Sequence, residues 1–235
     1  MQSKLNLVEP RIAVKADAYV FDIDGTILVT RDLVHWNGLH KAMLEVYGVD
    51  TTIEGIPYHG KTDIGILRAA LERCGIGGSA FERGLPEARA VICREVSAHA
   101  TEILGDVCPA IPELLLELSA SGKLLGIASG NLEIVGWHKV NAARVREFFS
   151  FGCFGDHSES RSEIFANAIS EIKRRLGSDA RACFIGDTPE DIRAARHVQA
   201  QIVAVSTGTY SRQELASLTP DGCCRSCTEM LGSLR

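Results

Sequence analysis

Two aspartates, two residues apart, give this chain its strongest chemical signal. Asp22 and Asp24 follow the apolar segment Tyr19-Val20-Phe21, and Gly25-Thr26 follows them. A strand that ends in this way presents both carboxylates at its C-terminal edge, where open α/β sheets bind ligands. Neighbouring carboxylates repel each other, and a cation or a shared proton relieves that repulsion. Taken alone, the pair is also compatible with a solvent-exposed Asp-Gly turn.

A second acidic cluster, Gly186-Asp187-Thr188-Pro189-Glu190-Asp191, follows another apolar segment. Mg²⁺ prefers a few carboxylates, several waters and a substrate phosphate, so Asp187 is expected to share one ion with the first pair. Asp191 lies beyond a helix-starting proline and is expected to support the metal ligands. The alternative is a capped helix start with acids in its first turn. Together the clusters predict a magnesium-dependent aspartyl-phosphate site.

A third polar segment, Ser129-Gly130-Asn131, follows the apolar segment 124–128. A hydroxyl group and free backbone N–H groups at a helix N-terminus can bind an anion. A simple helix cap explains the segment equally well.

The elements that must position these residues alternate between short apolar segments and amphipathic ones. This alternation predicts an α/β fold with a doubly wound, parallel, Rossmann-like sheet. The expected strands are 18–23, 124–128, 182–185 and 201–205, and the expected helices are 109–121, 162–176 and 189–198. Residues 32–104 contain only helical patterns, at 36–47, 63–74 and 81–103. We therefore expect a core domain of 1–31 and 105–235 and an inserted helical cap domain of 32–104.

Composition narrows the class of protein. The net charge of −5 argues against nucleic acid or an anionic membrane as a partner, and no apolar segment reaches the ~20 residues of a membrane span. Residues 1–5 do not resemble a signal peptide, which predicts a cytoplasmic protein. Five of the eight cysteines are scattered among apolar neighbours and are expected to be buried thiols: Cys74, Cys93, Cys108, Cys153 and Cys183. The pair Cys224 and Cys227 lacks a second pair, so a late strand and turn is favoured over a zinc site.

In this order, the three polar motifs resemble those of the haloacid dehalogenase-like superfamily, in its phosphatase branch. The resemblance covers nearly the whole chain and includes the inserted cap. It implies Mg²⁺ as cofactor and a small phosphorylated metabolite as substrate, and we expect a monomer or homodimer.

The resemblance also implies roles for individual residues. Asp22 is expected to be the nucleophile and Asp24 the general acid and base, with its backbone carbonyl on the metal. Asp187 is the remaining metal ligand, supported by Asp191. The phosphate-binding residues are expected to be Ser129, Gly130 and Asn131, with Thr26 contributing hydrogen bonds from the first loop.

One departure from the family pattern concerns the cation before the last motif. The family usually has a lysine there, often followed by proline, and this chain has no Lys-Pro. Arg161 stands at the corresponding helix start and is expected to neutralise the phosphate, as a bidentate donor. Lys139 and Lys173 are expected to be solvent-exposed. In the cap, Lys61 can bind a second anionic group of the substrate, or its neighbours Thr62-Asp63 can simply cap a helix.

No role is expected for five histidines, because nothing pairs them for catalysis or metal binding: His35, His40, His99, His138 and His197. The favoured function is a magnesium-dependent phosphatase that hydrolyses a small organic phosphate monoester. The alternatives are a phosphosugar mutase with the same aspartyl-phosphate chemistry and a non-catalytic binding protein. A dehalogenase is disfavoured by the second aspartate, and a phosphonate hydrolase depends on Lys61 forming an imine.

Overall fold

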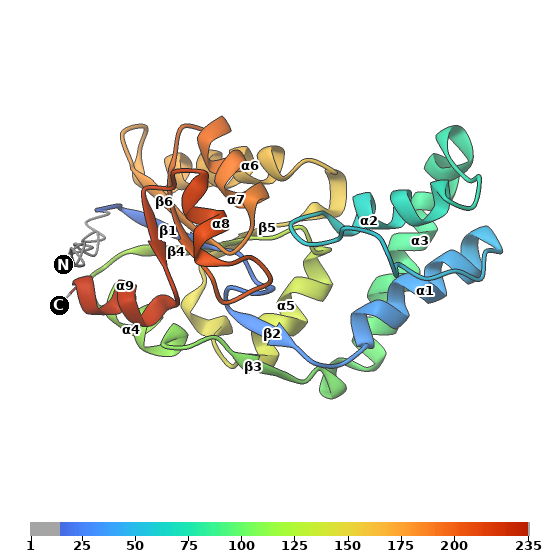
Figure 1. The fold of residues 1–235 in the computed structure, drawn as a ribbon, viewed down its shortest axis with the longest axis horizontal. Coiled ribbons are helices and arrows are strands. Elements are labelled where there is room, and N and C mark those ends of the chain that lie inside the picture. Colours follow the sequence, from blue (N-terminus) through green and yellow to red (C-terminus); the bar gives the residue numbers. More distant parts are fainter. Residues whose placement is uncertain (1–14, 235) are drawn as a thin grey trace, which may run out of the picture.

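The core of the protein is a six-stranded parallel sheet in a computed structural model that describes residues 15–234. Residues 1–5, for which the sequence predicts no signal peptide, lie outside the described residues. Helices cover both faces of the sheet (Figure 1). In spatial order the strands are β5 (Phe151–Cys153), β4 (Leu124–Ala128), β1 (Ala18–Phe21), β6 (Ala182–Gly186), β7 (Gln201–Val205) and β8 (Gly222–Cys224). The predicted Rossmann-like fold is confirmed.

Strand β1 lies in the middle of the sheet, and every one of its residues is buried. Tyr19 and Phe21 point into one apolar cluster, and the alternate residues Ala18 and Val20 point into the other. Such continuous burial is typical of parallel strands covered on both faces. Phe21 is in register with Ile127 of β4 and with Ile185 of β6. The three central strands therefore end together, and the polar motifs that follow them meet at one edge.

The core helices divide between the two faces of the sheet. Helices α6 and α7 pack in the cluster that contains Phe165 and Ile192, and α4 and α9 pack in the cluster that contains Leu114 and Met230. Helix α7 begins with a capping box between Thr188 and Asp191. The helices are α4 (Ile111–Ala120), α5 (Glu133–Ala142), α6 (Arg161–Leu176), α7 (Pro189–His197), α8 (Arg212–Ser217) and α9 (Cys227–Leu234), with short 3₁₀ turns η2 (Arg146–Phe148) and η3 (Gly155–His157).

Three helices form a separate body beside the sheet, α1 (Val34–Tyr47), α2 (Asp63–Glu72) and α3 (Gly78–Ala98), followed by the 3₁₀ turn η1 (Ala100–Glu102). They share an apolar cluster of their own, which Leu132 and Val135 of the core join. A two-stranded antiparallel ribbon, β2 (Leu28–Thr30) and β3 (Gly105–Val107), connects this body to the core (Figure 1). We propose that residues 32–104 are the cap domain and that 1–31 and 105–235 are the core domain.

The sequence missed the ribbon and the edge strand β5, which are only three residues long. A late strand near the C-terminal cysteines is confirmed as β8. Of the five cysteines expected to be buried, Cys108 and Cys183 are buried and Cys93 and Cys153 are half-buried. The expectation is wrong for Cys74, because α2 ends at Glu72 and leaves Cys74 exposed in the following turn. Within residues 15–234, no helix is both long and apolar enough to cross a membrane.

Candidate active site

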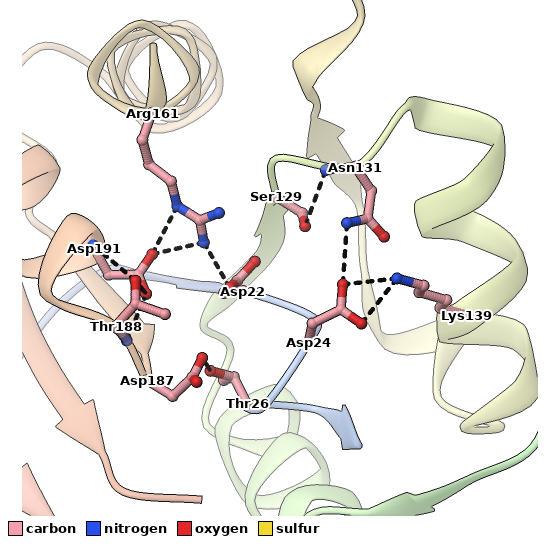
Figure 2. A network of polar contacts seen from close by, with 10 residues as sticks. All are labelled: Asp22, Asp24, Thr26, Ser129, Asn131, Lys139, Arg161, Asp187, Thr188 and Asp191. Carbon is pink, nitrogen blue, oxygen red and sulfur yellow. Dashed lines mark hydrogen bonds and ion pairs between the residues drawn. The ribbon is translucent and has the colours of Figure 1, made fainter. Parts of the chain in front are cut away.

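The site lies where β1, β4 and β6 end. Asp22, Ser129 and Asp187 follow these strands directly, and all three side chains are buried. Carboxylate oxygens of Asp22, Asp187 and Asp191 lie within 4.8 Å of one another (Figure 2). The sequence placed the first two together, and it expected Asp191 nearby in a supporting role. No cysteine or histidine joins a comparable cluster anywhere in the part of the chain that the structure describes.

The buried carboxylates repel one another strongly. Burial, followed by the charges of Asp191 and Asp22, raises the pKa of Asp187 well above its usual value. Burial also raises the pKa of Asp22 to about 6, although Arg161 opposes the shift. Oδ1 of Asp22 is buried and has no hydrogen-bond partner among the described residues. These features fit a divalent cation, and the all-oxygen donor set suits Mg²⁺.

The two loops of the site close tightly around Asp187. Oδ1 of this residue accepts a hydrogen bond of 3.2 Å from Thr26, which is fully buried. A Cβ atom added to Gly25 or to Gly208 would overlap the carboxylate of Asp187. Gly25 also has a φ of 79°, a conformation that glycine adopts without strain. The backbone therefore fixes the position of this carboxylate.

Arg161 lies where the sequence expected the cation. Its Nη2 atom is 2.6 Å from Oδ2 of Asp22, and its Nε atom donates to Oδ1 of Asp191 at 2.8 Å (Figure 2). Arg161 is only 8% exposed, so both of its ion pairs are largely shielded from water. A fixed, planar cation thus faces the expected nucleophile. Asp191 is held further by Thr188, whose hydroxyl donates to it at 2.7 Å.

Asp24 points away from the other carboxylates. Both of its oxygens accept hydrogen bonds of 2.8 Å from Nζ of Lys139, and Oδ2 accepts one of 3.0 Å from Asn131 (Figure 2). Burial acts to raise the pKa of Asp24, but Lys139, together with Asn131 and His35, holds it below its usual value. Asp24 is therefore charged in this arrangement. Its side chain is not part of the acidic cluster, which leaves only its backbone carbonyl for the expected metal contact.

The structure corrects the expectations for Lys139 and for His35. Lys139 is 3% exposed and contacts Asp24, so the expectation of a solvent-exposed lysine is wrong, whereas Lys173 is exposed as expected. His35, for which no role was expected, also belongs to this group of contacts, because its Nδ1 atom lies 3.1 Å from Nζ of Lys139. The spacing of α5 carried a signal for Lys139, because this residue shares the buried face of the helix with Val135 and Gly136.

A cavity of about 590 Å³ lies over the acidic cluster, between the cap helices and the edge of the sheet. The expected site residues that line it are Asp22, Asp24, Lys61, Ser129, Asn131, Arg161 and Asp187. Thr26 and Gly130 are not among its lining residues: Thr26 supports Asp187, and the carbonyl oxygen of Gly130 accepts a hydrogen bond from the N–H of Asp63. Thr62 caps α2, and the preceding residue, Lys61, lines the cavity.

Proteins with the same fold and related sequences are known. The crystal structure of CbbY from Rhodobacter sphaeroides in complex with phosphate has the same fold, with a TM-score of 0.66, 18% identity, and coverage of 94% of this chain and 99% of that one. A phosphoglycolate phosphatase of Agrobacterium fabrum is 25% identical over 86% of this chain and 85% of its own length. A phosphoglycolate phosphatase of Synechococcus elongatus is 31% identical over 50% of this chain, and the match spans only 57% of that relative.

The site and the Agrobacterium relative, which matches most of the chain, indicate an enzyme, a hydrolase of the phosphatase class. The model of the family described as haloacid dehalogenase-like hydrolase matches residues 19–205. The chain therefore belongs to the haloacid dehalogenase-like hydrolases. The match begins in β1 and ends at the last residue of β7, so it includes all three polar motifs and the inserted helices.

Proposed function

We propose that the protein is a magnesium-dependent phosphatase that hydrolyses a small organic phosphate monoester through an aspartyl-phosphate on Asp22. The observation that carries this proposal is the position of Asp22. One of its oxygens is paired with Arg161, and the other is buried beside two further carboxylates, with no hydrogen-bond partner within residues 15–234. An attacking carboxylate needs such a free oxygen aimed at the phosphorus atom.

The residues divide the work of phosphoryl transfer. Asp22, Asp187 and the backbone carbonyl of Asp24 would hold the metal, and Asp191 would support them through Arg161. When bound, Mg²⁺ supplies positive charge that neutralises the phosphoryl oxygens. Arg161 faces the same oxygens from α6. This is the fixed electrostatic clamp that a metaphosphate-like transition state requires.

Ser129 and Asn131 bind the phosphoryl group from the other side of the site. Both residues line the cavity, on the loop between β4 and α5. The N-terminal turn of a helix presents free N–H groups to an anion. We propose that Thr26 and Gly130 act indirectly, through Asp187 and Asp63 respectively.

Asp24 would move the protons. The bond between phosphorus and the leaving oxygen breaks as Asp22 attacks, and a proton passes from Asp24 to that oxygen. In the second step Asp24 takes a proton from the water that attacks the aspartyl-phosphate. Because Asp24 is charged beforehand, it first takes the proton of the phosphate monoanion, whose second pKa is about 6, and then passes that proton to the leaving oxygen.

The relatives and the cavity support a proposal about the substrate class. Both curated relatives carry the name phosphoglycolate phosphatase, which denotes a phosphate ester with a second anionic group. We propose a substrate of that kind, with its second anion held by Lys61 of the cap. We further propose that the enzyme acts in the cytoplasm as a monomer or homodimer.

The test is phosphate release from a panel of phosphorylated metabolites that includes 2-phosphoglycolate. We expect release by the wild type with Mg²⁺ and a loss of roughly 10⁴-fold or more in Asp22→Asn, as for deletion of a nucleophile. Chelation with EDTA should remove the activity reversibly. Asp179→Asn, at an exposed site, is the matched control and should leave activity unchanged. Activity of Asp22→Asn within about tenfold of wild type would refute the proposal.

A further inference from the structure

Lys139 is buried at a position where its charge contributes little to the stability of the fold. The residue is 3% exposed, whereas the side chain of its partner Asp24 is 41% exposed and can be solvated by water. Removing an ammonium group from water is costly, and one partly exposed carboxylate offsets that cost incompletely. A buried lysine of this kind calls for a functional reason.

The contacts of Lys139 extend from the core into the cap. Its Nζ atom lies 3.1 Å from Nδ1 of His35, on α1, and Nε2 of His35 lies 3.1 Å from Oδ2 of Asp63, at the start of α2. The same Oδ2 atom accepts a 2.8 Å hydrogen bond from the N–H of Leu132. Leu132 follows Asn131, which donates to Asp24. The contacts thus form a closed ring.

This ring passes through both parts of the protein. Asp24, Asn131 and Lys139 belong to the core, and His35 and Asp63 belong to the proposed cap. Two links cross between them, one from Lys139 to His35 and one from Leu132 to Asp63. Displacement of the cap would break both links and leave Lys139 without its histidine.

We propose that Lys139 is a positioning residue, which holds the carboxyl group of Asp24 toward the leaving oxygen and is itself held by His35 when the cap is closed. This inference rests on the proposed function and adds a residue to it. A general acid must lie within about 2.6–3.2 Å of the oxygen that it protonates. Paired charged hydrogen bonds fix an otherwise partly exposed carboxylate at such a distance.

The contribution of Asp24 to the rate depends on the leaving group of the substrate. A poor leaving group, such as an alkoxide, needs a proton in the transition state, and a good one, such as 2,4-dinitrophenolate, does not. Misplacing Asp24 should therefore slow an alkyl phosphate much more than 2,4-dinitrophenyl phosphate. A residue that only stabilises the fold would slow both substrates equally.

The experiment measures kcat/KM, which reports the first phosphoryl transfer, for the best alkyl substrate and for 2,4-dinitrophenyl phosphate. For Lys139→Met we expect a loss of about 10²-fold on the alkyl substrate, within the range of general acid catalysis. We expect a loss below about tenfold on the dinitrophenyl substrate, because no proton is needed there. Lys139→Arg should recover part of the alkyl activity. Lys173→Met, on the exposed side of α6, is the matched control and should match wild type on both substrates.

Two further variants test the route of the effect. If Lys139 acts only through Asp24, the double variant Asp24→Asn/Lys139→Met should be no slower than Asp24→Asn alone. His35→Ala should show the same leaving-group pattern as Lys139→Met, with a smaller loss. Because each comparison is a ratio between two substrates on one preparation, partial misfolding cancels.

The possible failures are distinguishable. Equal losses on both substrates, no loss in Lys139→Met, or additive losses in the double variant would overturn the positioning role and leave the phosphatase proposal intact. A wild-type protein that turns over neither substrate with Mg²⁺ would overturn both proposals.

Discussion

At the residue scale, the site is built from carboxylates that destabilise one another. Asp22 and Asp187 both have raised pKa values, mainly because they are buried and face further acids. A carboxyl group with a raised pKa in the folded state binds protons more tightly there than in the unfolded chain. Deprotonation of such a group therefore lowers the free energy of unfolding as the pH rises. For Asp22 this loss occurs between about pH 4, near the pKa of the unfolded chain, and about pH 6, the pKa in the folded protein. A bound cation would offset that cost.

Asp187→Asn should therefore stabilise the metal-free protein while removing activity. In EDTA at pH 7.5, we expect a gain on the order of 1 kcal/mol, or about 2–4 °C in Tm. The gain should shrink at pH 5, where wild-type Asp187 is more readily protonated. Thermal unfolding at the two pH values checks this. A lower Tm for the variant at pH 7.5 would show that Asp187 does not carry the repulsion described.

The sequence predicted the site residues at the ends of strands and helices better than those that meet through tertiary packing. Asp22, Asp187 and Arg161 each stand directly at the end of a strand or the start of a helix, so local patterns placed them. Lys139 meets both Asp24 and His35 only through the packing of α5 against the first loop and the helices of 32–104. Their contacts span more than 100 residues of chain, and no local spacing encodes such a distance.

At the element scale, the strand ends and their loops fix the site. β1, β4 and β6 were predicted within one or two residues, since continuous apolar segments closed by polar residues are clear signals. The three-residue strands β2, β3 and β5 were not predicted, because segments this short cannot show a periodic pattern of apolar residues. The loop after β7 was also not assigned to the site, although Gly208 contacts Asp187 and lines the cavity.

Gly208→Ala should therefore impair the site through Asp187. The added methyl group would overlap the carboxylate, and a displacement of about 1 Å at a catalytic group can cost about 10²-fold in rate. Phosphate release as a function of Mg²⁺ concentration measures the effect. The variant should need a higher Mg²⁺ concentration for half-maximal activity, because its Asp187 binds the metal less well. Gly232→Ala is the control, because a Cβ there meets nothing within 4 Å. Wild-type kinetics for Gly208→Ala would contradict the tight packing of this loop.

At the scale of the whole molecule, the cap and the core are joined by more than the β2–β3 ribbon. Leu132, in the loop between β4 and α5, is fully buried in the apolar cluster of the cap helices. Arg68 of α2 forms paired hydrogen bonds of 3.0 and 2.8 Å with Glu159 of the core. The sequence predicted the helical interval 32–104, on which the proposed division into domains rests. The contacts between the two parts were not, because they depend on the final placement of distant elements.

Leu132→Ala should weaken both parts together. We expect a loss of about 2–5 kcal/mol in the free energy of unfolding, as for other buried leucines, and a single cooperative transition in denaturant. Leu116→Ala is the matched control, because Leu116 is exposed and its truncation should change stability by less than about 0.5 kcal/mol. Two separate transitions in the wild type would show that cap and core unfold independently.

The most direct measurement is mass spectrometry of the enzyme quenched in acid during turnover with Mg²⁺ and its best substrate. We expect one added phosphoryl group on the peptide that contains Asp22, and none on that peptide in Asp22→Asn. A phosphoryl group on another residue, or turnover without any phosphorylated enzyme in rapid-quench samples, would contradict nucleophilic attack by Asp22.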